Sequence, residues 1–548
     1  MTSRRTGSAT ARWLAPVLAL VVLVGGCTGG GSADPPVTAP PDEALEPVVP
    51  VDGGVLRVAS GPLPLDWSPA AQVWDTSATQ VARGLYDRLV VYDANGTAVG
   101  QLAESVEADG DDFTTWTIRL RRGVLFHDGT PLDAFAVAAN LEAQRTSVVG
   151  ADILAPVVSV TTPSSLTVEV SMSQPWSTFP ETLATQVGYV ASPATLLGGG
   201  PLPVGTGPFR MPSVGETTVV TEAAQDGIVL VANDFYWQAG LPRLDAVAFP
   251  VRVDPMERVA AVIAGEADLV AADRPDQLVR LERAARRDAV TLVEDRNAES
   301  PKVAVALNTG QAPFDRISAR RAVGLATDRD EMVDDVLDGE GTVARGPISD
   351  PSPWFSDLPL PVPDTPRARG EAATYAEESG EPLALELLVP PDPLLVDTAR
   401  LWREQLAEVD VPVTLVPVTE AELADRLARG QYQAAMTIGF VAAHPDLYEP
   451  QFRGIPGEQP LVNPNVTRYV SPVVTESFED ARATADVAAQ VEAYGSGVRD
   501  VTTWDLPGGG RGLGQDGVTV SLAQIWLDPT TPTTTTQATG TTLAEAPG

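Results

Sequence analysis

Cysteine and histidine are nearly absent from this chain. Its 548 residues include one cysteine, Cys27, and two histidines, His127 and His444. One thiol excludes an internal disulfide and the paired-cysteine spacing of zinc sites. The chain also contains no His-rich helix motif, phosphate loop or nucleophile elbow. Carboxylates are abundant enough to leave a glycosidase-type pair open, but no pair stands out. We therefore expect no enzyme, no metal and no cofactor.

Positive charge is scarce as well. The chain has 37 lysines and arginines against 73 aspartates and glutamates, a net charge of −36. Nucleic-acid binding requires a basic surface, so this class of function is excluded. A strongly acidic surface is a common solubility trait of secreted proteins, and we prefer that interpretation to a trap for cationic ligands.

Only one long apolar run is present, and it lies at the N-terminus. Residues 13–24 follow three arginines and are too few to span a bilayer, which takes about 20 apolar residues. A basic start and a short apolar run are typical of a secretory signal. The run ends in 24–27 (VGGC), which looks like a bacterial lipobox in which the Cys27 thiol takes a diacylglycerol. We expect a lipid anchor on the extracytoplasmic face of the cell membrane. An ordinary signal with an incidental cysteine is the alternative.

Low-complexity segments flank the body of the chain. Residues 28–50 are rich in glycine, proline and alanine, which predicts a flexible tether. Residues 529–548 are a Thr/Pro/Ala tail that we expect to be disordered. The body, residues 51–528, is longer than one core usually holds and predicts two or three domains.

Strand and helix signals alternate through residues 383–440. The expected strands are 383–389, 411–416 and 433–440. One helix is expected near 398–409, and a second begins with a capping box at Thr419 and ends at Gly430. This alternation predicts an α/β layer with parallel strands. Because ligands bind beyond the carboxyl ends of such strands, residues 439–443 are a candidate site.

Other local signals are clear. Residues 115–120 alternate apolar and polar side chains, as in a half-buried strand. Asp133, Asp254 and Asp328 each precede a helical pattern and are predicted N-caps. Residues 126–131 (FHDGTP) predict a tight turn, in which we expect His127 to make a local hydrogen bond with Asp128.

Five segments together resemble a known family. They are 84–90 (GLYDRLV), 102–132 (LAES to RRGVLFHDGTPL), 203–209 (PVGTGPF), 233–245 (NDFYW to Asp245) and 308–329 (NT to DR). In order and spacing they are similar to the family 5 extracellular solute-binding proteins, the peptide and nickel-type binding subunits of ABC importers. The resemblance covers about residues 54–340. The last third of the chain matches in layout more than in motif.

The resemblance implies an α/β, two-lobed periplasmic-binding-protein-like fold of type II that closes on a ligand. Lobe I would comprise residues 51–265, with an inserted subdomain at about 76–190, and lobe II residues 266–465. Residues 466–528 would return to lobe I.

The family's ligand-binding aspartate is missing. Peptide binders of the family hold the ligand amine with an aspartate just after the last strand of lobe II. In this chain that position falls on Ala443, and Asp446 lies three residues further on. A buried ammonium without a carboxylate is costly, which argues against binding of a free peptide amine there.

Candidate ligand contacts follow from the resemblance. They are Trp67, Trp74, Phe440, Val441, His444 and Asp446. The two tryptophans lie in the loop after the first strand, where stacking on a ligand and packing within the protein are equally expected.

The sequence favours a monomeric, lipid-anchored binding protein that delivers an oligopeptide or another small polar solute to an ABC permease. The alternative is a lipoprotein of the same fold that acts in cell-envelope assembly or regulation instead of import. An envelope hydrolase has the least support.

Overall fold

The computed structural model describes most of the body of the chain. The described residues are 52–93, 96–198, 202–213, 227–272, 274–294, 302–339, 341–344, 346–348, 352–355, 362–438, 442, 444–454, 463–502, 527–529 and 534–537. The expected signal peptide (1–27), with Cys27, and the expected tether (28–50) lie outside them. Among the described residues, no helix is long and apolar enough to cross a membrane.

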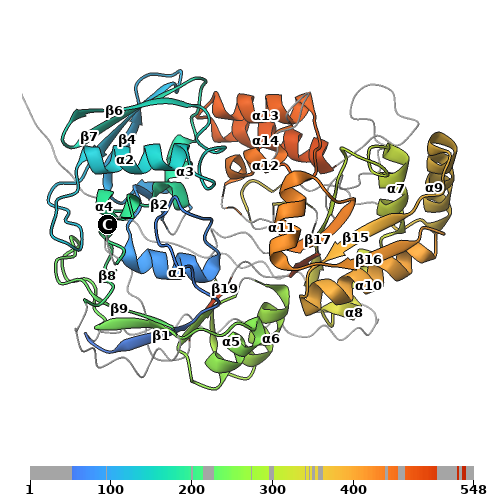
Figure 1. Ribbon diagram of the computed structural model, residues 1–548, viewed down its shortest axis with the longest axis horizontal. Coiled ribbons are helices and arrows are strands. Elements are labelled where there is room, and N and C mark those ends of the chain that lie inside the picture. The colour runs from blue at the N-terminus through green and yellow to red at the C-terminus, as the bar shows by residue number, and fades with distance from the viewer. Residues whose placement is uncertain are drawn as a thin grey trace, which may run out of the picture. The chain divides into compact units, whose positions relative to one another are not determined.

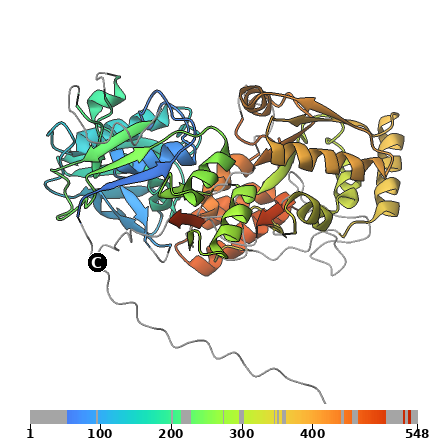
Figure 2. The same cartoon turned by 90° about the horizontal axis from the view of Figure 1, so that it is seen from below.

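A mixed seven-stranded sheet has the order β12-β19-β11-β1-β10-β9-β8. Its strands are β1 (Val55–Ala59), β8 (Phe209–Arg210), β9 (Ile228–Ala232), β10 (Ala246–Phe249), β11 (Leu269–Ala271), β12 (Thr291–Glu294) and β19 (Thr534–Gln537). The first strand is central and pairs in parallel with β10 and β11, so segments far apart in sequence share this sheet (Figure 2). Helices α1 (Thr76–Leu85), α5 (Pro255–Ile263) and α6 (Pro275–Ala285) accompany it (Figure 1).

Strand β19 lies within the tail that we expected to be disordered. Thr534–Gln537 pairs antiparallel with both β11 and β12, so the expectation is wrong for these four residues. Threonine is β-branched and favours extended backbone, and two strand edges supply the hydrogen-bond partners. Strand β18 (Leu527–Pro529) similarly pairs with β14.

A four-stranded antiparallel sheet of order β4-β5-β7-β6 forms the inserted region. Its strands are β4 (Ala103–Ala108), β5 (Thr115–Leu120), β6 (Val157–Ser164) and β7 (Thr167–Met172). As the alternation in β5 predicted, Trp116, Ile118 and Leu120 are buried in one core and Arg119 is exposed, but Thr117 on the other face is buried as well. That core also contains Trp176 and Phe179, the latter in α3 (Phe179–Leu183). Strands β2 (Val90–Tyr92) and β3 (Ala98–Gly100) and helices α2 (Ala134–Arg145) and α4 (Pro193–Leu196) complete this region.

A six-stranded sheet of order β14-β18-β13-β17-β15-β16 carries the predicted α/β layer. Its strands are β13 (Val303–Leu307), β14 (Gly341–Val343), β15 (Leu385–Val389), β16 (Val413–Pro417), β17 (Ala434–Ile438) and β18. The parallel pairing of β15 with β16 and β17 confirms the prediction from residues 383–440. Its helices are α7 (Ile317–Ala326), α8 (Arg329–Val336), α9 (Thr365–Ser379), α10 (Pro393–Ala407) and α11 (Glu420–Arg429).

The predicted helix ends are also confirmed. The Asp133, Asp254 and Asp328 carboxylates accept from the backbone N–H groups at the starts of α2, α5 and α8, at 2.7–3.0 Å. Thr419 caps α11, and Gly430 ends it at a φ of 66°, the left-handed conformation that favours glycine.

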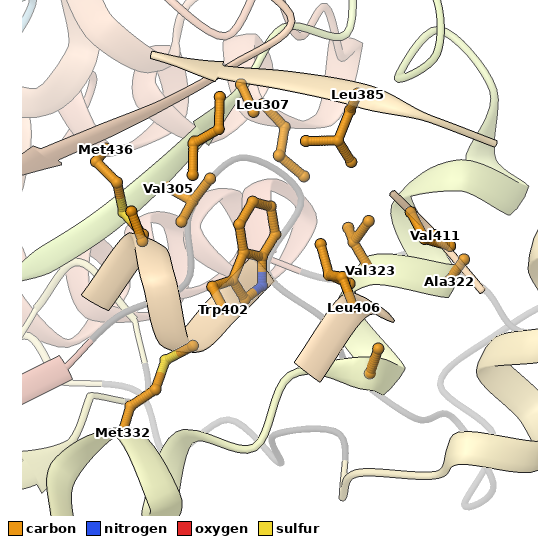
Figure 3. Packing of buried hydrophobic residues seen from close by; sticks show 14 of the residues in the cluster. Val305, Leu307, Ala322, Val323, Met332, Leu385, Trp402, Leu406, Val411 and Met436 are labelled. Carbon is orange, nitrogen blue, oxygen red and sulfur yellow. The ribbon is translucent and has the colours of Figure 1, made fainter. Parts of the chain in front are cut away.

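Trp402 lies at the centre of the core beneath the six-stranded sheet (Figure 3). It is fully buried, and Leu307, Val323 and Leu406 belong to the same core. Its indole N–H donates to the Thr327 hydroxyl at 2.8 Å, which satisfies the one polar atom of the side chain.

Two C-terminal helices, α13 (Pro472–Arg482) and α14 (Val487–Thr502), lie side by side (Figure 1). They share a core with the segment after β17, which forms η2 (Pro445–Tyr448) and α12 (Glu449–Phe452). The expected boundary at residue 466, between lobe II and a return to lobe I, therefore does not separate two cores.

Candidate functional site

A groove with a volume of about 300 Å³ opens beside the carboxyl ends of β15, β16 and β17. Its lining residues are Arg274, Pro390, Asp392, Leu395, Glu420, Leu423, Ala424, Leu427, Thr437 and Ile438. The aliphatic side chains form an apolar wall, and one guanidinium and two carboxylates supply the charge. The position agrees with the rule that places ligands beyond the carboxyl ends of parallel strands. It also lies directly before residues 439–443, which we singled out from the sequence.

Arg274 follows β11 of the seven-stranded sheet and binds the loop after β15 of the six-stranded sheet. It precedes α6, and its guanidinium contacts the carboxylates of Asp276, at 3.1 and 3.2 Å, and of Asp392. The second nitrogen bound to Asp392 lies at 3.0 Å, so each carboxylate is held by two hydrogen bonds. Burial disfavours the charged guanidinium, but the hydrogen bonds to Asp392 and Asp276 outweigh it and raise the pKa of Arg274.

Glu420 stands at the start of α11 and lines the same groove. Its pKa is raised, first by burial and then by repulsion from Asp392, while Arg274 acts in the opposite direction. Sequence reasoning missed these three residues. The available signal was that Asp392 and Thr419 cap helices immediately after parallel strands, where side chains meet at one sheet edge.

Asp446, a predicted ligand contact, is bound within the protein. Its carboxylate accepts from the Trp176 indole N–H at 2.8 Å, from Arg482 Nε at 2.7 Å and from the Tyr494 hydroxyl at 3.2 Å. Its side chain is only 1% exposed. Burial raises its pKa, but Arg482 outweighs burial and holds the pKa below its ordinary value. With three donors in place, this carboxylate is not open to a ligand amine in the described conformation.

His444 is buried beside Asp446 and caps η2. Its Nδ1 accepts from the Asp446 backbone N–H at 3.2 Å. Its ring packs edge-on against Trp354, with centroids 4.6 Å apart, and against Tyr494 at 5.7 Å. Burial lowers the pKa of His444 to about 4, so the ring is neutral at pH 7. Three neighbouring positions, Phe440, Val441 and Ala443, lie outside the described residues.

Trp67 and Trp74 lie in one aromatic cluster. Both are buried, with centroids 6.3 Å apart, and Trp74 stacks on Tyr86 at 6.1 Å and meets Tyr189 edge-on at 5.5 Å. The Tyr86 hydroxyl donates to the Trp67 carbonyl at 2.9 Å. These contacts agree with the packing interpretation, and a role in ligand binding stays a prediction.

The expected hydrogen bond between His127 and Asp128 is not formed. His127 instead accepts from the Gly205 N–H through Nδ1 at 3.2 Å, and its Nε2 lies 3.0 Å from the Gly207 carbonyl. Asp128 accepts from Thr130 within its own turn. The ring bridges two of the resemblance segments because burial beside a glycine-rich turn offers it a backbone donor and a backbone acceptor.

No group of three histidine, cysteine, aspartate or glutamate side chains in the described part of the chain could hold a metal ion. The site consists of an apolar wall, one paired guanidinium and nearby carboxylates. Such a surface can bind a small polar molecule, and the described residues offer no activated nucleophile beside it.

Comparison with known proteins finds solute-binding proteins of similar sequence. The chain is 29% identical over 318 residues to the glutathione-binding protein of Pectobacterium atrosepticum, an overlap of 56% of this chain and 58% of that relative's length. It is 28% identical over 477 residues to a probable D,D-dipeptide-binding periplasmic protein of Escherichia coli, covering 81% of this chain and 86% of the relative.

Solved structures show the same fold. A periplasmic binding protein from A. tumefaciens in complex with agropinic acid superposes with a TM-score of 0.69 at 22% identity, covering 89% of this chain and 94% of that one. A peptide-bound periplasmic binding protein of Helicobacter pylori gives a TM-score of 0.70 at 17% identity, with the same coverage. The expected two-lobed α/β fold is therefore confirmed. The model of the bacterial extracellular solute-binding proteins, family 5, matches residues 97–452, more than half of the chain, and the protein belongs to that family.

Proposed function

We propose that this protein is the extracytoplasmic solute-binding subunit of an ABC importer and captures an oligopeptide or another small polar solute by lobe closure. The observation that carries the proposal is the groove at the carboxyl ends of β15–β17, bounded by Arg274 before α6 and by Asp392 and Glu420 at the starts of α10 and α11. Family membership and the peptide-binding and glutathione-binding names of its relatives support it. No bond is made or broken; the protein binds, closes and presents its ligand to a permease.

The three larger sheets suggest how the lobes are divided. In this proposal lobe I carries the seven-stranded and four-stranded sheets, and lobe II carries the six-stranded sheet. The shared core of α13, α14 and the segment after β17 supports extending lobe II through α14. Among the described residues after α14, those of β19 would then belong to lobe I.

Glu420 is the carboxylate that we propose meets a cationic group of the ligand. Asp446 is saturated by internal donors, and Asp392 is held by two hydrogen bonds from Arg274. Glu420 faces the same groove and is partly desolvated, which strengthens its attraction for a cation.

A thermal-shift screen tests the proposal. The chain without residues 1–27 is heated with di- to pentapeptides, glutathione, amino acids, nickel–histidine and sugars. A ligand at 100 times its dissociation constant adds about 2.7 kcal/mol to stability. We expect a peptide-like hit that the E420Q variant weakens, while E422Q leaves it unchanged, because Glu422 lies on the same helix outside the groove lining. No shift with any compound would contradict the import role.

The alternative, a lipoprotein of this fold with a role in envelope assembly or regulation, is favoured by one observation. The family's amine-binding aspartate is replaced by Ala443, and the nearby Asp446 is used internally. Permease and ATPase genes beside the gene for this chain support import, whereas an isolated gene supports the alternative.

A further inference from the structure

Trp176 connects two hydrophobic cores. Its ring belongs to the core of the four-stranded sheet and packs against Phe179, with centroids 5.4 Å apart. Its indole N–H donates at 2.8 Å to Asp446, which lies 270 residues further along the chain, in η2. The side chain is fully buried. Trp176 therefore packs in the core of the four-stranded sheet and donates a hydrogen bond to the segment after β17.

Asp446, Arg482 and Tyr494 form the socket that receives the indole, and they contact one another without Trp176. Arg482 on α13 holds the Asp446 carboxylate at 2.7 Å, and the Tyr494 hydroxyl on α14 donates to it at 3.2 Å. The helices that carry these donors pack in one core with η2, so the cluster does not depend on the four-stranded sheet. The Arg482 guanidinium lies over the Trp176 ring, 4.9 Å from its centroid. Carboxylate and guanidinium together bind both the edge and the face of an indole.

The neighbouring contacts across this junction are also polar. The Ser177 N–H donates to the Arg482 carbonyl at 2.8 Å, and the Gln490 amide donates to the Ser177 hydroxyl at 3.2 Å. The two hydrophobic cores on either side are separate clusters. Polar junctions between separate cores can part at modest cost, because water replaces the lost hydrogen bonds.

We propose that Trp176 is a positioning residue for solute capture: its indole docks in the Asp446–Arg482 socket when the lobes close, and this contact sets the fraction of closed protein. The inference rests on the proposed function, because it assumes that the lobes close on a solute. Asp446 then stabilises the closed state instead of contacting the ligand. A larger closed fraction raises apparent affinity in proportion, since a ligand that needs the closed state binds only that fraction.

Single-molecule Förster resonance energy transfer on the ligand-free chain without residues 1–27 tests this inference, because it measures the ratio of closed to open protein. Dyes are placed at V158C on β6 and R400C on α10, both exposed, in a chain that lacks Cys27. We expect a measurable closed population, because Asp446 and Arg482, which bind the indole, both belong to the protein itself. The W176F variant should lower the closed-to-open ratio at least about tenfold, since it removes a hydrogen bond to a charged acceptor.

W402F is the matched control. It also removes a buried indole hydrogen bond, but one made inside a single core, and it should leave the ratio unchanged. Q490A removes a junction contact without altering the indole and should shift the ratio in the same direction as W176F, by less. Circular dichroism establishes that each variant folds.

Two results would overturn the inference: a ligand-free protein that is entirely open, or a W176F ratio equal to that of W402F. The screen of solutes is independent of this measurement. A closed population that depends on Trp176, with no solute of the panel bound, would support the docking of Trp176 in the socket and contradict the import role.

Discussion

The Asp87 carboxylate accepts a hydrogen bond from the Trp237 indole N–H at 2.9 Å, across 150 residues of chain. It also accepts from the Tyr236 hydroxyl at 3.0 Å, the Thr206 hydroxyl at 3.1 Å and the Gln101 amide at 2.9 Å. Three of the segments that carry the family resemblance, 84–90, 203–209 and 233–245, therefore meet at one buried carboxylate. Their role is to hold the scaffold together.

Replacing Asp87 with asparagine should destabilise the protein by about 2–4 kcal/mol, because the new amide places a donor against a site built from donors. Urea unfolding measures the change. D128N is the matched control and should be nearly neutral, since Asp128 bonds only within its own exposed turn. Equal losses in the two variants would contradict the role assigned to Asp87.

Truncating Trp402 to alanine should cost about 3–5 kcal/mol of unfolding free energy, because it empties the centre of the core shown in Figure 3. W402F should cost about 1 kcal/mol, chiefly through the lost hydrogen bond to Thr327. F235A, at a side chain that is 75% exposed, should lie within about 0.5 kcal/mol of the parent. Chemical denaturation in urea ranks the three variants, and an F235A loss as large as that of W402A would refute the assignment.

Glu181 should make stability depend on pH. Burial, and then repulsion from Asp446, raises the pKa of its carboxyl from 4.5 to about 7 in the folded protein. Between these two values the unfolded chain releases a proton that the folded protein keeps, so this group lowers stability as pH rises from about 4.5 to about 7. The penalty is constant above that window and absent below it.

The E181Q variant lacks this penalty. It should be more stable than the parent at pH 8, by up to about 3 kcal/mol, and the difference should vanish near pH 4. Thermal unfolding at several pH values measures it, with E142Q as the exposed control. A constant difference between E181Q and the parent across this range would show that Glu181 titrates normally.

Replacing Cys27 with alanine tests the lipid anchor. We expect the parent chain in the membrane fraction and the C27A variant released, because one thiol is the only attachment point that the sequence offers. Fractionation followed by immunoblotting measures the distribution. Retention of C27A in the membrane fraction would contradict the anchor and leave ligand binding untouched.

Features encoded by neighbouring residues were predictable. The strands and helices of residues 383–440 follow from local alternation, and the caps at Asp133, Asp254 and Asp328 follow from single positions. The family followed from motif order. Partners chosen across the fold were not predictable, because no local period specifies them. Asp446 accepts a hydrogen bond from Trp176, 270 residues earlier in the chain, and His127 binds the 205–207 backbone instead of Asp128. The pairing of Arg274 with Asp392 is a further case.

The donors around Asp87 also bear on how the protein folds. Thr206, Tyr236 and Trp237 lie 119 to 150 residues downstream of the carboxylate they satisfy. During synthesis, which starts at the N-terminus, the chain cannot complete this cluster until residue 237 has been added. Such high contact order slows folding and lengthens the exposure of partly folded chains to aggregation and proteolysis.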